Sequence, residues 1–212
     1  GIVRVSGGSV RWAKVPGDPR NIYIPRIGWA DDATVIFDQL NRLQNTNNVW
    51  LGNAKSGSIQ LMFQDRDDAW VDIENVLNEN FYWLGKDAQK DLLYISERDG
   101  WRHAYAVSRN GNSRLITTGK FDLVSISAVD EDGGWLYYIA SPDNATQRYL
   151  YRSRLDGTGA PERITPADQP GTHTYNISPN GHWAFHSYSK FDEPGPSDLV
   201  SLPDHKVIRI FQ

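Results

Sequence analysis

The feature that most limits how this chain can fold is a repeated unit of short apolar segments separated by tight turns. The turns fall at Ser56-Gly57, Asn110-Gly111, Asp156-Gly157 and Asp204-His205. The glycines at positions 57, 111 and 157 are 54 and 46 residues apart. Because Asn-Gly and Asp-Gly readily supply the positive φ angles of two-residue turns, each turn is predicted to join two antiparallel strands.

Aromatic and β-branched segments accompany each turn, and such residues favour strands. One set of these segments covers residues 34–37, 92–95, 135–139 and 182–185. A unit of four strands with a period of roughly 40 to 50 residues is typical of a β-propeller blade. We therefore predict an all-β chain, a partial β-propeller of about four four-stranded blades, with little helix.

The repeat also sets approximate blade boundaries within a single predicted domain covering residues 1–212. The expected blades are 21–65, 72–119, 120–167 and 172–212. Residues 1–20 contain two short β-like pieces, which we interpret as outer strands of a preceding, incomplete blade. Closed propellers usually have more blades, so we expect an arc or a piece of a propeller. The polar segment 38–45 is expected to form a long hairpin that reaches beyond its blade.

Composition excludes several classes of protein. The 212 residues include 22 basic and 26 acidic side chains, a formal charge of −4, without a basic cluster that would indicate nucleic-acid binding. The absence of cysteine excludes disulfide scaffolds, thiolate metal sites and cysteine nucleophiles. No apolar run approaches the roughly 18 to 20 residues of a membrane helix. We therefore expect no nucleic-acid partner and no membrane span.

Motifs for catalysis are missing from the sequence. It contains no G-x-S-x-G elbow and no P-loop, so no catalytic residue is assigned. His182 and His186 are four residues apart and could hold a metal, but packing or solvent exposure is the favoured interpretation. The four aspartates within 65–72 could attract Ca²⁺, yet they lack the glycine and terminal glutamate of an EF-hand loop. We predict no metal and no cofactor.

The densest polar segment lies at residues 96–103. Proton transfer is one interpretation of its paired acids and bases. The favoured interpretation is structural: Asp99-Gly100 forms a hairpin turn whose flanks are tied by charge-assisted hydrogen bonds. The residues of this structural cluster are Glu97, Arg98, Asp99, Trp101, Arg102 and His103.

Substrate-contact candidates come from position alone. The connection after the first complete blade contains Trp70 and Asp72. Loops that join successive blades open toward a propeller face, where ligands often bind. We expect these two residues to contact a ligand.

Several of these segments resemble a known family. They are residues 23–26, 39–45, 68–72, 96–105, 150–151 and 177–181. Together they resemble the N-terminal β-propeller of the dipeptidyl peptidase IV branch of the prolyl oligopeptidase family, in particular its bacterial members. The resemblance extends over nearly the whole chain. It implies that the chain is the later half of an eight-bladed propeller covering an α/β-hydrolase domain, whose Ser-Asp-His triad removes N-terminal dipeptides, often after proline.

The same resemblance implies what this chain contributes. The paired glutamates that hold the substrate amino terminus have no counterpart here, since no Glu-Glu pair occurs. The family loop that contacts substrate follows a Trp-Val pair matching Trp70-Val71, but its arginine and aromatic align with residues 72–75. The implied partners are a C-terminal α/β-hydrolase domain and a peptide substrate. Periplasmic or exported location is also implied.

Two functions follow as hypotheses. The first is a non-catalytic propeller portion of a serine exopeptidase, which gates substrate access and shapes the cavity. The alternative is a stand-alone propeller that binds a protein or peptide and has no peptidase domain. A partial propeller leaves sheet faces and strand edges uncovered, so a homodimer that completes a ring is a separate expectation.

Overall fold

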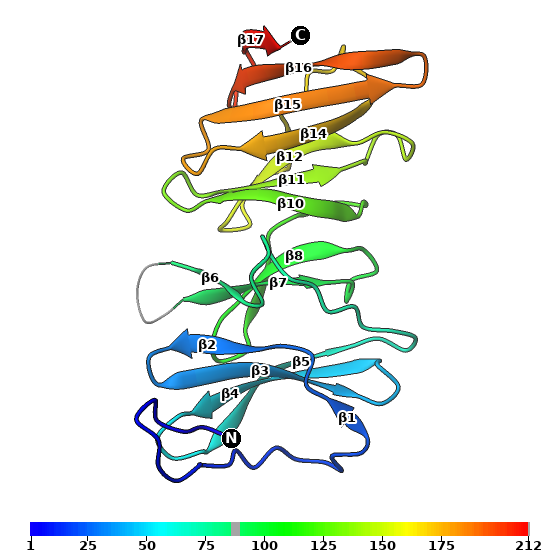
Figure 1. Cartoon of the computed structure of the whole chain (residues 1–212). Helices are drawn as coiled ribbons and strands as arrows, with labels where there is room; N and C mark the ends of the chain where they lie inside the picture. Colours follow the sequence, from blue (N-terminus) through cyan, green and yellow to red (C-terminus); the bar gives the residue numbers. More distant parts are fainter. Residues whose placement is uncertain (86–89, 212) are drawn as a thin grey trace. The chain divides into compact units, whose positions relative to one another are not determined.

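The computed structural model describes residues 1–85 and 90–211, and its regular elements are all strands (Figure 1). Within these described residues there is no helix, where the sequence predicts little, and hence no helix with the length and apolar character needed to cross a membrane. The strands form four separate sheets. This architecture confirms the predicted all-β fold with about four blade-like sheets.

The first sheet has five strands and the second has four, each built from consecutive parts of the chain. The strands of the first sheet are β1 (Ile22–Tyr23), β2 (Ile27–Asp31), β3 (Thr34–Asn41), β4 (Thr46–Asn53) and β5 (Ile59–Arg66). Those of the second sheet are β6 (Tyr82–Leu84), β7 (Asp91–Ser96), β8 (His103–Val107) and β9 (Ser113–Leu115).

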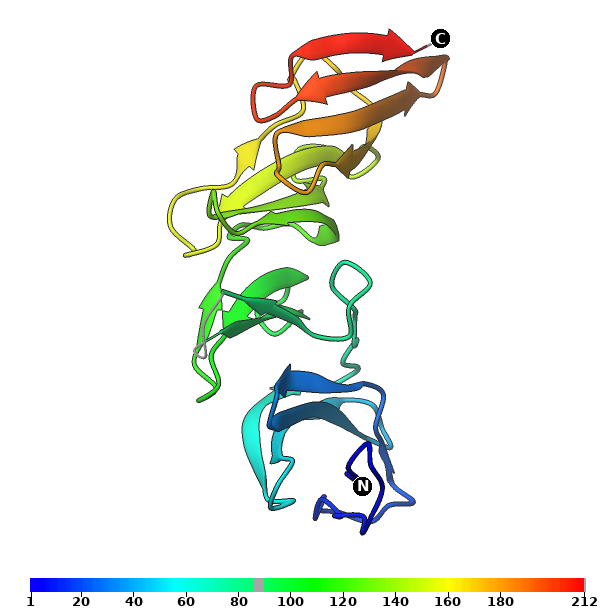
Figure 2. The same cartoon turned by 60° about the vertical axis from the view of Figure 1, so that its left-hand side comes forward.

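The third and fourth sheets also have four strands each, ordered as they occur in the chain. Figure 2 shows the four strands of the fourth sheet side by side in orange and red. The third sheet contains β10 (Leu123–Asp130), β11 (Trp135–Ala140), β12 (Tyr149–Arg154) and β13 (Glu162–Arg163). The fourth contains β14 (Thr172–Ile177), β15 (Trp183–Lys190), β16 (Glu193–Ser201) and β17 (Val207–Phe211).

The chain forms two compact units, and the boundary between them runs through the second sheet. One unit is Gly1–Asp99 with Val107–Ser113, and the other is Gly100–Ala106 with Arg114–Gln212. The first unit therefore contains the whole first sheet, and the second unit contains the whole third and fourth sheets.

In the first sheet, the outermost position is shared by two short strands. β1 and β2 both pair with β3, one after the other along its length. Pro25 lies between them, and proline has no amide hydrogen to donate to a neighbouring strand. The long hairpin predicted at residues 38–45 is confirmed by the continuous pairing of β3 with β4, from Thr34 opposite Asn53 to Leu40 opposite Asn47.

The N-terminal segment of the first unit is largely irregular. Of the two strand-like pieces expected within residues 1–20, the structure forms one antiparallel bridge, between Ile2 and Arg11. Gln39 fixes the end of this segment, because its Nε2 donates to the Pro16 carbonyl at 2.6 Å while its Oε1 accepts from Trp50 Nε1 at 2.8 Å.

The predicted tight turns have the backbone that their residues favour. Gly57, Gly111 and Gly157 adopt φ values of 75°, 86° and 74°, and His205 occupies the fourth turn with φ 51°. At two of these turns the neighbouring backbone also leaves no room for a side chain. A Cβ on Gly111 would lie 2.3 Å from the Met62 carbonyl oxygen.

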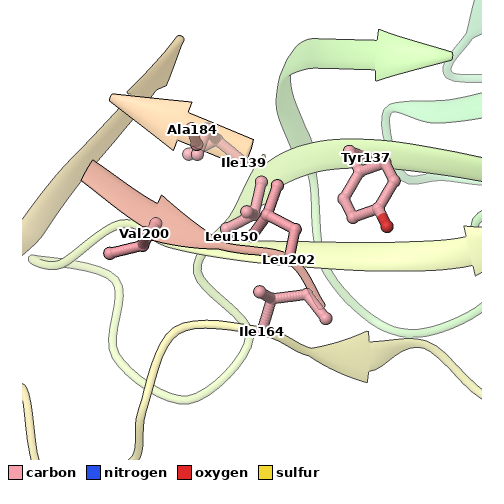
Figure 3. Packing of buried hydrophobic residues seen from close by; sticks show 7 residues of the cluster. All are labelled: Tyr137, Ile139, Leu150, Ile164, Ala184, Val200 and Leu202. Carbon is pink, nitrogen blue, oxygen red and sulfur yellow. The ribbon is translucent and has the colours of Figure 1, made fainter. Parts of the chain in front are cut away.

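The third and fourth sheets pack on one another through a shared apolar core (Figure 3). Its side chains are all at least nine-tenths buried, and burying a Leu, Ile or Val side chain contributes about 1.5–3 kcal/mol. The core consists of Tyr137, Ile139, Leu150, Ile164, Ala184, Val200 and Leu202. Residues of β11, β12, β15 and β16, with Ile164 and Leu202 just beyond strand ends, thus hold the two sheets together.

A buried threonine ends the outer strand region of two successive sheets. The Thr117 hydroxyl accepts a hydrogen bond from the Ala104 amide at 2.9 Å. In the next sheet Thr165 accepts from the Leu150 amide at 2.8 Å. In both places a side-chain oxygen satisfies a strand amide where the outer strand stops, which buried amides require.

Candidate functional site

The two predicted ligand contacts lie on the connection from the first to the second sheet, residues 67–79, here called the Trp70 loop. Trp70 exposes 53% of its surface, and Asp72 is also exposed. An exposed indole offers a flat apolar surface, and nearby carboxylates attract cationic groups. The loop can therefore contact an apolar side chain and a positively charged group of one ligand.

The start of the Trp70 loop is held against the β3–β4 hairpin. Asp67 Oδ1 accepts from the amides of Ala69 at 2.7 Å and Trp70 at 3.3 Å, which fixes the turn that presents the indole. Val71 is buried, and its amide donates to the Gln44 carbonyl at the hairpin tip. The polar hairpin that the sequence predicts therefore serves as the support of this loop.

The later part of the Trp70 loop is held by a buried ion pair. Arg26 Nε lies 2.5 Å from Asp38 Oδ2, and both side chains are at least nine-tenths buried. The Arg26 guanidinium also donates to the Glu74 carbonyl and lies 4.7 Å from the centre of the Phe81 ring. Asp38 in turn accepts from Asn47 Nδ2 at 3.0 Å. This guanidinium, to which the sequence analysis assigned no role, connects the loop to β3.

A second polar group lies next to this ion pair. Asn47 Nδ2 is 3.3 Å from the Tyr94 hydroxyl, and Ser96 Oγ donates to Asp65 Oδ1 at 2.9 Å. Arg98 Nη2 lies 3.4 Å from the same Asp65 oxygen. Burial raises the pKa of Tyr94 far above its usual range, so the phenol stays neutral. The site thus has charged groups in its interior that are already partnered.

The predicted cluster at 96–103 contacts more than its own turn. Besides binding Asp65, Arg98 donates to Ser96 Oγ at 3.1 Å. Arg102 donates to the carbonyls of Leu123 and Val124 on β10. The pattern of charges therefore located the turn, but not the strands that its arginines contact.

The other members of that cluster differ in exposure. His103 is buried and packs edge-on against Phe121, with ring centres 5.7 Å apart. Trp101 is 38% exposed, and Glu97 and Asp99 lie at the surface of the turn.

The metal sites considered from the sequence, at His182 and His186 and at the aspartates within 65–72, do not form within residues 1–85 and 90–211. In these ranges no three His, Asp or Glu side chains form a group that could hold a metal ion. Asp65 is engaged by Ser96 and Arg98, and Asp67 by loop amides. His182 is exposed just before β15, whereas His186 is buried inside the fourth sheet.

A family comparison decides what kind of chain carries this loop. Residues 1–195 match the family described as dipeptidyl peptidase IV (DPP IV) N-terminal region. The chain belongs to this family. The match includes the Trp70 loop, the cluster at 96–103 and the first three sheets, which confirms the family predicted from the sequence.

Relatives of this DPP IV-type chain include fungal proteins. It is 29% identical over 194 residues to the Aspergillus oryzae protein named "Probable dipeptidyl-aminopeptidase B", which covers 86% of this chain and 20% of that protein. It is 26% identical over 143 residues to the Emericella nidulans protein named "Probable dipeptidyl peptidase 4", covering 63% of this chain and 18% of that protein. The chain thus spans about a fifth of the length of these relatives.

A solved structure has the same fold. Porphyromonas gingivalis dipeptidyl peptidase 4 superposes with a TM-score of 0.74 over 94% of this chain and 27% of its own, at 24% sequence identity. This likeness supports the architecture of the four sheets.

Proposed function

We propose that this chain is the non-catalytic propeller portion of a DPP IV-like serine exopeptidase, which gates substrate access and shapes the cavity in which a separate α/β-hydrolase domain releases N-terminal dipeptides. The observation that carries the proposal is the family match over residues 1–195, joined to relatives about five times longer. A wall of sheets over an active site admits chain ends and excludes folded proteins by size.

The Trp70 loop is the proposed contact with the peptide substrate. Its indole is exposed, yet the backbone is fixed on both sides: before it by Asp67, which accepts from the Ala69 and Trp70 amides, and after it by the Val71 amide and the Arg26 contact to Glu74. A rigid exposed aromatic loses little conformational entropy on binding. Trp70 would pack on a substrate side chain, and the Asp72 carboxylate would attract its positive charge. Export from a bacterial cell and association into a homodimer belong to the same proposal.

The first test compares hydrolysis of a Gly-Pro chromogenic amide by the 212-residue chain and by the full product of its gene. We expect activity only in the full product, together with a downstream G-x-S-x-G segment. A gene that encodes no hydrolase segment would favour the stand-alone binding module. Activity of the 212-residue chain alone would contradict a non-catalytic role.

A second test addresses the Trp70 loop in the full gene product. Trp70→Ala should raise KM for tripeptides about tenfold, and Asp72→Asn should do so for substrates with a basic side chain. Trp29→Ala and Asp68→Asn are the matched controls, since Trp29 is 59% exposed on β2 and Asp68 is exposed beside Trp70. Equal effects of a variant and its control would exclude a specific contact.

A further inference from the structure

One continuous hydrogen-bonded chain runs through the interior of the second unit. Asp198 Oδ1 on β16 lies 2.9 Å from His186 Nδ1 on β15. His186 Nε2 lies 2.9 Å from His173 Nδ1 on β14, and His173 Nε2 lies 3.0 Å from the Gln169 carbonyl oxygen. The three residues are 1%, 2% and 6% exposed for His173, His186 and Asp198. These groups must therefore satisfy one another.

The groups at the two ends of this hydrogen-bonded series, the Gln169 carbonyl and the Asp198 carboxylate, fix how many protons the series must contain. A backbone carbonyl oxygen only accepts hydrogen bonds, and so does an ionised carboxylate. His173 must donate to Gln169 through Nε2, so the Nδ1 of a neutral ring accepts from His186 Nε2. His186 Nδ1 then has no proton to give to Asp198. Two neutral rings supply two protons, whereas the three links need three.

We propose that the folded protein holds a third proton on this chain, shared between Asp198 Oδ1 and His186 Nδ1, and that this proton locks three strands of the fourth sheet to the connection carrying Gln169. With three protons the chain has no net charge. With two it carries a buried negative charge and places two acceptors against each other, which is costly in a protein interior. Loss of the proton at alkaline pH releases the lock.

The surroundings oppose a fourth proton. Burial is the main cause that lowers the pKa of His173 to about 4, so this ring does not take up a second proton near neutral pH. Both histidine rings stack on tyrosines, with ring centres 4.9 Å apart for His173 and Tyr188. The titratable and charged groups around the chain are Tyr149, Arg163, Tyr175, Tyr188, Asp204 and His205.

A neighbouring series of hydrogen bonds in the same unit needs no added proton. Tyr175 Oη lies 2.8 Å from His205 Nε2 and 2.9 Å from Thr165 Oγ1. Both hydroxyls can donate as well as accept, so a neutral His205 ring completes this chain without an added proton. The extra proton is required only where acceptors stand at both ends.

The third proton makes stability fall on the alkaline side. In the unfolded protein both histidines are neutral above about pH 7.5, so the unfolded groups bind two protons while the folded chain binds three. The folding equilibrium constant should then fall about tenfold per pH unit above pH 7.5 until the folded chain releases its third proton. A chain with two protons would add no slope in this range.

The test is urea denaturation of the 212-residue chain between pH 7.5 and 9, followed by tryptophan fluorescence. In Asp198→Asn the amide can donate to His186 Nδ1 without titrating. The folding equilibrium constant of this variant should therefore lose the tenfold fall per pH unit that we expect of the original protein. His182→Gln, which changes an exposed histidine, should keep the original slope. Equal slopes for the original protein and Asp198→Asn would overturn the proposal.

A measurement without a variant tests the same point. In protein with ¹⁵N-labelled histidine, NMR distinguishes bare from protonated or hydrogen-bonded ring nitrogens. At pH 7.5 we expect protons on His173 Nε2 and His186 Nε2 and a His186 Nδ1 signal displaced from that of a bare nitrogen. A bare signal at His186 Nδ1 or at His173 Nε2 would overturn the proposal.

Discussion

Single turn residues of this chain are constrained by the strand beside them as well as by their own φ. Gly157 has φ 74°, and a Cβ there would lie 2.4 Å from the Leu115 carbonyl oxygen. Gly159 has φ 78°, but a Cβ there would meet nothing within 4 Å. The two glycines therefore separate the cost of backbone conformation from the cost of a steric clash.

This pair gives the first prediction. Gly159→Ala should lower the free energy of unfolding by about 1–2 kcal/mol, the usual cost of a left-handed conformation for a residue with a side chain. Gly157→Ala should cost about 1–3 kcal/mol more, because the Leu115 strand must shift. Urea denaturation measures both. Equal losses would show that the neighbouring strand yields without cost.

Two ion pairs of the first unit differ in burial, and we expect them to differ in their contribution to stability. Asp38 is buried against Arg26, whereas Asp31 pairs with Arg109 at 2.7 Å on the surface. Asp38→Asn should lower the free energy of unfolding by about 3–5 kcal/mol, since it leaves a buried guanidinium uncompensated. Asp31→Asn should cost about 0–1 kcal/mol. A loss of less than 1 kcal/mol in Asp38→Asn would mean that water reaches Arg26.

At the scale of the strand, the buried threonine that ends an outer strand region is expected to be necessary for the register of its sheet. Thr165 accepts from the Leu150 amide and contacts the Tyr175 hydroxyl. Thr165→Val keeps the shape but leaves these groups unpaired, so it should cost about 1–3 kcal/mol in thermal or urea denaturation. Thr165→Ser keeps the hydroxyl and should recover most of that loss. If valine and serine behave alike, the hydroxyl contributes nothing.

Elements whose signals are local were predictable from the sequence. Positive φ at Gly57, Gly111 and Gly157 follows from their turn dipeptides, and the β3–β4 hairpin follows from continuity of its flanking strands. The support of the later part of the Trp70 loop was not predictable. It depends on Arg26, which lies 48 residues before Glu74 in sequence, and a single arginine gives no sign of its partner.

At the scale of the whole molecule, the repeat predicts four sheets because each sheet is built from consecutive strands, so nearly all pairing is local. The buried histidine chain escaped the same reasoning. His173, His186 and Asp198 lie on three different strands, β14, β15 and β16. Only the register with which these strands pair brings the three side chains together. The spacing of His182 and His186 suggested a pair, but one side chain is exposed and the other is buried.

Acid should destabilise the molecule because buried histidine rings resist protonation in the folded state. Burial is the main cause that lowers the pKa of His173 and of His205. As pH falls below about 6.5, the unfolded histidines take up protons that the folded ones refuse, so stability is present above that pH and is lost as pH falls toward 4. Each ring that stays unprotonated in the fold lowers the folding equilibrium constant about tenfold per pH unit.

His205→Asn isolates one of these rings, because asparagine tolerates the left-handed backbone at this turn. At pH 7 the variant should lose about 1 kcal/mol with the Tyr175 hydrogen bond. As pH falls below about 6.5, the folding equilibrium constant of the variant should fall less steeply than that of the original protein, by up to about tenfold per pH unit, while His182→Gln leaves the slope unchanged. Urea denaturation at fixed pH gives both slopes. An unaltered acid slope in His205→Asn would mean that His205 accepts its proton inside the fold and does not contribute to the acid sensitivity.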